Sequence, residues 1–150
     1  MELMQIPDLR TYSDEDHNGF VDLVNDVHAE FGYSYDSVLD ADLADPRAFY
    51  RHIWIARIGG SVVGSVALTP AKDGVTTLKR MYLRPELRGQ GWGRRLLGKA
   101  VETAVNEGWK RIVLDSGAHQ QAAHRLYDVA GFELDRVDGT SLYFSKELRP

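Results

Sequence analysis

Apolar side chains recur at helical spacing in three parts of the chain, and these predict helices over about 13–32, 92–106 and 119–130. The repeating face of the first consists of Phe20, Leu23, Val24, Val27 and His28. That of the central helix consists of Leu96, Leu97, Ala100, Val101, Ala104 and Val105. A less regular stretch predicts a further helix over about 37–50, interrupted at Pro46.

Shorter apolar runs predict strands between these helices. They lie at about 3–12, 52–58, 61–68, 75–83, 111–115, 132–137 and 141–148. Gly59-Gly60 and Asp138-Gly139 are typical two-residue hairpin turns. The order strand, two helices, three strands, helix, strand, helix, two strands predicts an α/β fold. Its mixed (α+β) sheet carries helices on its faces, unlike the regular alternation of a doubly wound fold.

Composition narrows the class of protein. A chain of 150 residues is expected to form one domain over 1–150. It has no cysteine, which excludes disulfides and cysteine nucleophiles. Because no secretory signal or run of 18 apolar residues is present, we expect a cytoplasmic protein that does not bind membranes. The net charge of −4 argues against a nucleic acid partner.

A glycine-rich segment, Arg88-Gly-Gln-Gly-Trp-Gly93, precedes the predicted central helix. Glycines at a helix start are typical of phosphate sites. A dinucleotide fingerprint fits poorly, because Arg94 stands where the third glycine belongs and the preceding strands form a meander. A Walker A loop over 93–100 fits no better. Ala100 has no hydroxyl for magnesium, and the segment lies within a helical stripe.

The same segment resembles the R-x-x-G-x-G motif of the GNAT superfamily, the acetyl-CoA-dependent N-acetyltransferases. Residues 119–132 resemble a second motif of that family, N-x-x-A-x-x-L-Y-x-x-x-G-F. The positions on pattern are Ala123, Leu126, Tyr127, Gly131 and Phe132, whereas Gln120 replaces the commoner asparagine. The resemblance covers roughly 52–145 and matches the first fifty residues only in outline. It implies a GNAT-like acyl-CoA N-acyltransferase fold, with about six to seven strands and about four helices.

The resemblance also implies where acetyl-CoA binds. Its pyrophosphate would lie at the start of the central helix, where unpaired N–H groups and the helix dipole attract anions. Pantetheine would lie where 78–83 opens away from 111–115, bonded to the backbone at Met81, Tyr82 and Leu83. The other implied cofactor-binding residues are Arg88, Gly89, Gln90, Gly91, Trp92, Gly93, Arg94, Gln120 and Ala123. No metal is implied, and coenzyme A is the expected product.

Tyr127 stands where the family places the residue that protonates the departing thiolate. A phenol is protonated at neutral pH and can supply that proton. It is also a typical core residue on a helical stripe. The general base stays unassigned, since His28, Glu30 and His119 are all candidates.

The family takes acceptor specificity largely from the first two helices and their loop. The implied acceptor residues here are His28, Glu30, Phe31 and Tyr33, with Asp36, Asp40 and Asp42 adding negative charge. These predict a small cationic amine, or an exposed amine of a peptide or protein, as acceptor. The alternative is a non-catalytic acyl-CoA sensor. The last strand, 141–148, is expected to be exposed at an edge, where it could pair across a homodimer.

Overall fold

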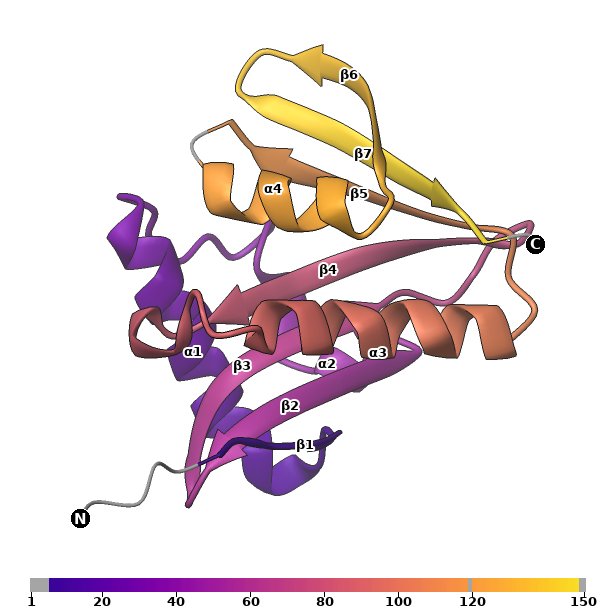
Figure 1. The fold of residues 1–150 in the computed structure, drawn as a ribbon. Helices are drawn as coiled ribbons and strands as arrows, with labels where there is room; N and C mark the ends of the chain where they lie inside the picture. The colour runs from indigo at the N-terminus through magenta and orange to yellow at the C-terminus, as the bar shows by residue number, and fades with distance from the viewer. Residues whose placement is uncertain (1–5, 119, 149–150) are drawn as a thin grey trace.

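The computed structural model describes residues 6–118 and 120–148, and its centre is a seven-stranded sheet (Figure 1). The strands follow the order β1-β2-β3-β4-β5-β7-β6. Only β4 and β5 are parallel, and all other neighbours are antiparallel. The strands are β1 (Asp8–Thr11), β2 (His52–Ile58), β3 (Ser61–Leu68), β4 (Val75–Leu83), β5 (Arg111–Gly117), β6 (Glu133–Asp138) and β7 (Ser141–Glu147).

Helices cover both faces of this sheet (Figure 1). They are α1 (His17–Glu30), α2 (Pro46–Phe49), α3 (Trp92–Asn106) and α4 (Gln121–Val129), with short 3-10 turns η1 (Asp14–Asp16), η2 (Ala41–Leu43) and η3 (Pro85–Leu87). The mixed sheet and helical layers predicted from the sequence are confirmed. No helix in the described part of the chain is long and apolar enough to cross a membrane.

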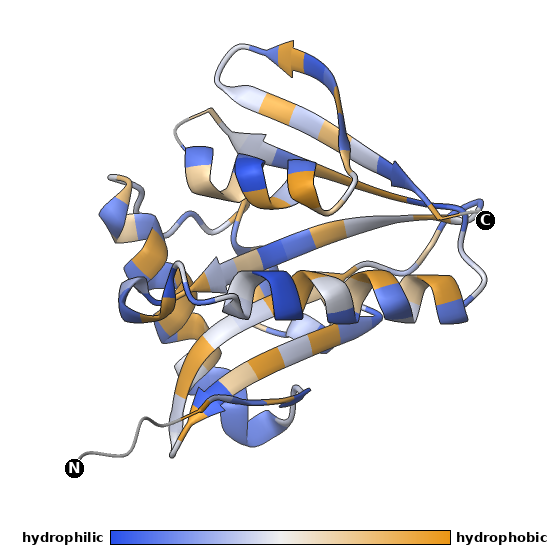
Figure 2. Cartoon of the chain, in the orientation of Figure 1, coloured by the Kyte–Doolittle hydropathy of each residue, from blue (hydrophilic) through white to orange (hydrophobic). Residues whose placement is uncertain are grey.

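The alternation of side chains along β2 divides the core in two. Trp54 and Ala56 belong to one cluster, which α3 and α4 cover, whereas Ile53 and Ile55 belong to another beneath α1. Apolar residues accordingly follow one another along β2 and β3 in Figure 2. The strand β3, buried in seven of its eight residues, lies between both layers and is the apolar centre of the molecule.

The predicted helix over 37–50 is wrong for most of its length, because only η2 and the four-residue α2 form there. Local side-chain hydrogen bonds compete with helix formation. The Asp36 carboxylate accepts bonds from the N–H groups of Val38 and Leu39, at 2.8 and 2.9 Å. The Asp40 carboxylate accepts a third, from the Asp36 N–H at 2.9 Å. This segment is therefore largely a loop, in which Val38 and Leu39 are exposed whereas Leu43 is buried in the core.

The expectation that 141–148 lies at an edge is also wrong. The strand β7 has β5 on one side and β6 on the other. The edge strand is instead β6, every residue of which is exposed. Pairing across a dimer through β7 is excluded by these two ladders.

Two helical glycines predict opposite effects of a methyl group. A Cβ at Gly19 of α1 would lie 2.6 Å from Cγ2 of the buried Val62, whereas a Cβ at Gly98 of α3 would meet nothing within 4 Å. We expect Gly98→Ala to raise the free energy of unfolding by up to about 1 kcal/mol. Gly19→Ala should lower it by about 1–3 kcal/mol, because overpacking outweighs helix propensity. Urea denaturation measures both, and stabilisation by Gly19→Ala would contradict the close α1–β3 contact.

Candidate functional site

The strands β4 and β5 pair over only part of their length. Their ladder joins Val75–Thr77 to Arg111–Val113 and ends there, although both strands continue. Beyond this point they diverge toward their carboxyl ends (Figure 1). The predicted opening of 78–83 away from 111–115 is thereby confirmed. A cavity of about 780 Å³ lies here, bounded by both strands, α4 and the loop that follows α1.

A bulge in β4 shapes one wall of the cavity. The register with β3 shifts between Ser65 and Ala67, and the opposing residue Arg80 has a φ of 53°. Left-handed backbone is unfavourable for a residue with a Cβ. The Ser65 hydroxyl holds the turn by donating to the Arg80 carbonyl oxygen at 2.7 Å. The bulge therefore sends the Arg80 side chain away from regular strand alternation.

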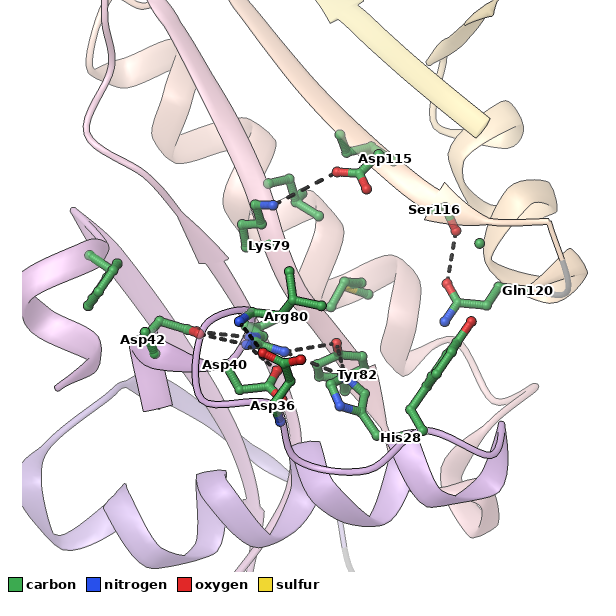
Figure 3. Close-up of a pocket in the computed structure, with 18 of the residues that line it drawn as sticks. His28, Asp36, Asp40, Asp42, Lys79, Arg80, Tyr82, Asp115, Ser116 and Gln120 are labelled. Carbon is green, nitrogen blue, oxygen red and sulfur yellow. Dashed lines mark hydrogen bonds and ion pairs between the residues drawn. The ribbon is translucent and has the colours of Figure 1, made fainter. Parts of the chain in front are cut away.

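The Arg80 guanidinium binds two buried carboxylates of the preceding loop (Figure 3). Its Nε and Nη2 donate to Asp42 at 2.9 and 2.6 Å, and Nη2 also donates to Asp40 at 3.1 Å. The Tyr50 hydroxyl donates to Asp42 at 2.6 Å. Burial alone would raise the pKa of Asp42, but the bonds from Arg80 and Tyr50 outweigh it and hold that pKa below its ordinary value. This charged cluster fastens the loop to β4.

His28 and Tyr82 form a second contact between α1 and β4 in the same cavity (Figure 3). Nε2 of His28 lies 2.9 Å from the Tyr82 hydroxyl, and Nη1 of Arg80 lies 3.4 Å from that hydroxyl. Burial and the charge of Arg80 lower the pKa of His28, against the opposing effect of nearby carboxylates. Burial raises the pKa of Tyr82. Both side chains are therefore neutral at pH 7.

The glycine-rich segment forms the turn before α3, which begins at Trp92 as predicted. Gly89 and Gly91 have φ values of 78° and 91°, a conformation that favours glycine, and Gly91 is the N-cap. Gly93 lies close to α4, because a Cβ there would be 3.2 Å from Cδ2 of Leu126. The first N–H groups of α3 have no partners within the helix. This turn can therefore hold an anion.

The side chains of this turn have partners within the protein. Arg88 donates to both carboxylate oxygens of Glu30, at 2.7 and 2.8 Å, and its Nε donates to the Leu83 carbonyl oxygen at 3.0 Å. Gln90 donates to the Glu86 carbonyl oxygen at 2.9 Å. The two candidates Arg88 and Glu30 are thus joined to each other. Arg94 is exposed on the first turn of α3.

The helix α4 supplies the opposite wall of the cavity. Tyr127 is 4 % exposed, borders the cavity and packs against the rings of Phe132 and Phe144. Burial raises its pKa, so the phenol stays protonated over the physiological range. Gln120 also borders the cavity and accepts a bond from the Ser116 hydroxyl at 2.9 Å. Tyr127 is therefore a core residue that also borders the cavity, and its catalytic role stays a prediction.

The predicted acceptor residues do not all lie at the cavity. His28 and Tyr33 border the cavity, and their rings lie 6.1 Å apart, edge to face. Of the described residues, Glu30 and Phe31 lie outside its lining. Ala123 packs partly buried against the main core, and the candidate base His119 lies outside the described residues.

Sequence reasoning missed the importance of Arg80, Tyr50 and Lys79. A charged residue inside a predicted strand was the available signal for Arg80, but its partners lie about 40 positions away. Lys79 pairs with Asp115 across the opening at 3.8 Å. Charges on the cavity wall are mostly acidic: they are Asp36, Asp40, Asp42 and Asp115 against Lys79 and Arg80. No group of three or more metal-ligating side chains occurs within 6–118 and 120–148.

The fold is shared with solved acetyltransferases. An acetyltransferase from Streptococcus agalactiae 2603 superposes with a TM-score of 0.87, at 25 % identity, covering 97 % of this chain and all of that one. The fold class is that of the GNAT acyl-CoA N-acyltransferases. The family model "Acetyltransferase (GNAT) family" matches residues 18–132. The chain therefore belongs to the GNAT family and is an acetyl-CoA-dependent N-acetyltransferase.

Sequence relatives agree with this membership. The Escherichia coli K12 N-acetyltransferase YjgM is 29 % identical over 156 residues, covering 97 % of this chain and 93 % of that protein. The N-acetylaspartate synthetase of Danio rerio is 35 % identical over 114 residues, or 72 % of this chain. The match spans 40 % of that longer relative.

The charged cluster around Arg80 predicts a large effect of losing its positive charge. We expect Arg80→Met to lower the free energy of unfolding by about 3–5 kcal/mol, because Asp40 and Asp42 stay buried without a cation. Urea denaturation at pH 7 measures this. The triple variant Asp40→Asn, Asp42→Asn, Arg80→Met should recover part of the loss, and an equal loss in both variants would contradict charge pairing as its source.

The same variant predicts a pH dependence. The pKa of Asp42 is lowered in the folded state, so its carboxylate stabilises the protein above its ordinary pKa of 3.8. That contribution disappears as the pH falls through the folded-state value. The stability difference between wild type and Arg80→Met should therefore narrow below about pH 4.

Proposed function

We propose that this protein transfers the acetyl group of acetyl-CoA to a small cationic amine, or to an exposed amine of a peptide or protein. One observation carries the proposal: a single cavity joins the β4–β5 opening and Tyr127 to an acidic loop. A non-catalytic sensor would need the opening but not an acceptor pocket beside it. The arrangement therefore favours catalysis over sensing.

The cofactor site follows from the turn before α3. Backbone N–H groups and the helix dipole there suit a pyrophosphate, and Gly89 and Gly91 leave the backbone accessible. Exposed Arg94 adds a cation beside them. Arg88 is held by Glu30, so we assign Glu30 to positioning this arginine rather than to binding the acceptor. Pantetheine then lies in the opening against Met81–Leu83.

The side chains around this path complete the cofactor site. The Arg95 guanidinium lies over the Trp92 ring, with Cζ 4.5 Å from the ring centre. This contact shapes the first turn of α3. Gln90 closes the turn on Glu86, while Gln120 presents its amide at the cavity wall.

The reaction needs an oxyanion stabilised and a thiolate protonated. The neutral amine attacks the thioester carbonyl carbon, the C–N bond forms and the C–S bond breaks. Backbone N–H groups at Met81–Leu83 stabilise the oxyanion. Tyr127 donates its phenolic proton to the departing sulfur and regains one from solvent. Its position on the cavity wall, with burial keeping it protonated, supports this role.

The acceptor class follows from the charge and apolar rim of the loop. Asp36 lies at the cavity with no cation within salt-bridge distance among the described side chains. Val38 and Leu39 are 80 % and 78 % exposed at its mouth, and Phe49 is also exposed there. An ammonium is attracted by the carboxylate, while an apolar portion covers these side chains. A cationic amine with an apolar group fits both.

Thermal unfolding with acetyl-CoA and coenzyme A tests the cofactor site. A ligand at a hundredfold excess over its Kd adds about 2.7 kcal/mol of stability. We expect this stabilisation in the wild type and its loss in Gly91→Val, whose side chain blocks the turn. Gly139→Val is the matched control, because Gly139 also has a positive φ, of 60°, in the remote β6–β7 turn. Equal ligand shifts in both variants would contradict the assignment.

Acetyl transfer to a panel of amines then tests the acceptor class. Phenethylamine is a cationic amine with an apolar group, whereas aspartate carries two carboxylates and is suggested by the N-acetylaspartate synthetase relative. We expect kcat/KM for phenethylamine to exceed that for aspartate at least about tenfold, about 1.4 kcal/mol. The reverse order would overturn the proposed acceptor class while leaving the cofactor site intact.

Tyr127→Phe tests the proton donor. We expect kcat to fall well over tenfold, within the range of about 10²–10⁴ typical of general acid catalysis. The acetyl-CoA-induced shift in Tm should stay close to that of the wild type, because the ring still packs against Phe132 and Phe144. An unchanged kcat would remove Tyr127 from the chemistry.

A further inference from the structure

The contact between His28 and Tyr82 joins two groups that can each carry a proton. They come from α1 and β4 and meet at 2.9 Å on the wall of the cavity. Their rings lie 5.5 Å apart and nearly perpendicular. Figure 3 shows both beside Arg80 and turned toward the same space. The pair is therefore placed to receive a proton from a group bound in the cavity.

The surroundings determine which ring nitrogen accepts. Nη1 of Arg80 lies 3.5 Å from Nε2 of His28 and 3.4 Å from the Tyr82 oxygen. A guanidinium only donates hydrogen bonds. A proton on Nε2 would face this donor, so the favoured tautomer carries its proton on Nδ1. The Tyr82 hydroxyl then donates to Nε2, and its oxygen accepts from Arg80.

The Tyr82 oxygen borders the cavity and is not held by a strong donor. Its contact with Nη1 of Arg80 is long, at 3.4 Å. An acceptor ammonium in the cavity can donate to this oxygen in its place. The positive charge of Arg80 also lowers the pKa of an ammonium placed beside it. Arg80 therefore reduces the free-energy cost of proton transfer away from the amine at this point.

Carboxylates on the cavity wall are less suited to accept that proton. Asp40 and Asp42 bind Arg80, Asp115 pairs with Lys79, and Asp36 accepts backbone bonds that lower its pKa. Among the described residues of the wall, His28 is the only imidazole. The His28 imidazole is therefore both uncharged at neutral pH and able to contact a group bound in the cavity.

We propose that His28 is the general base of the acetyl transfer and that the Tyr82 hydroxyl relays the proton to it. The inference rests on the proposed function, because it needs an amine acceptor. An ammonium N–H bond breaks as its proton joins the Tyr82 oxygen, and the original phenolic proton moves to Nε2 of His28. The amine is left neutral and the imidazole becomes an imidazolium, which returns its proton to water after transfer.

Charges that face His28 determine its titration. Arg80 lies on β4 and disfavours the imidazolium, whereas Asp40 and Asp42 lie on the facing loop and favour it. The rings of Tyr82 and Tyr33 also pack against it, edge to face. Burial and Arg80 prevail, and they place the pKa of His28 below its ordinary value of 6.5. The imidazole is thus ready to accept a proton at neutral pH.

Nitrogen-15 NMR of the uniformly labelled full chain tests the resting state directly. His28→Gln assigns the signals of this ring. We expect a neutral ring at pH 7 with the proton on Nδ1. A charged ring, or a proton on Nε2, would overturn the proposal whether or not an acceptor has been found.

The pH dependence of kcat with phenethylamine tests the role in turnover. His28→Gln should lower kcat about 100-fold at pH 7 and lose the inflection due to the imidazole. Its activity should recover as the pH rises and solution supplies neutral amine. Tyr82→Phe should show a similar loss, and the double variant should lose little more than either single one, because both act in one relay.

His17→Gln is the matched control. His17 also lies on α1 and contacts a tyrosine hydroxyl, that of Tyr12 at 3.1 Å, but it does not border the cavity. Its pH profile should equal that of the wild type. A wild-type profile in His28→Gln would overturn the relay alone. Absence of acetyl-CoA stabilisation and of turnover in the wild type would instead overturn the proposed function, and the relay with it.

Discussion

The early end of hydrogen bonding between β4 and β5 is the constraint on which the rest of the site depends. Parallel strands that remained paired would place their side chains against the helices and leave no space between them. Here the ladder ends after Thr77 and Val113, and a cavity opens where backbone groups become available. The strand β7 compensates by pairing with β5 over its whole length. The opening therefore leaves the sheet otherwise continuous.

Buried charge holds the loop after α1 beside this opening. Arg80 is in an unfavourable backbone conformation, and two carboxylates of that preceding loop, Asp40 and Asp42, bind its side chain. Burying such a cluster contributes little net stability compared with apolar packing. The cluster instead fixes the relative positions of the loop, the bulge and Tyr82, because one guanidinium contacts all three. A few side chains thus fix this loop as one wall of the cavity.

The turn before α3 and the wall of the cavity differ in how they are built. The turn presents main-chain N–H groups at the start of a helix, which suit an anion. The cavity wall uses side chains on α1, its following loop and β4. Side chains on this wall can change without disturbing the sheet, so the same scaffold can carry different pockets.

Local signals explain which predictions from sequence are confirmed. The strands 52–58, 61–68 and 75–83 and the start of α3 at Trp92 have the predicted bounds, because turn glycines and side-chain periodicity act between near neighbours. The helix over 37–50 is wrong, since the Asp36 and Asp40 side chains bind backbone groups that a helix would use.

The sequence by itself therefore determined the order of the strands, the glycine turn before α3 and the helix that carries Tyr127. Only the tertiary structure decided the partners across the cavity. His28 and Tyr82 are 54 positions apart, and Arg88 and Glu30 are 58 apart. Such pairs depend on how α1 crosses the sheet and on the bulge at Arg80, and neither leaves a periodic pattern along the chain. Long-range packing sets these distances, so the residues that meet become known only once the chain has folded.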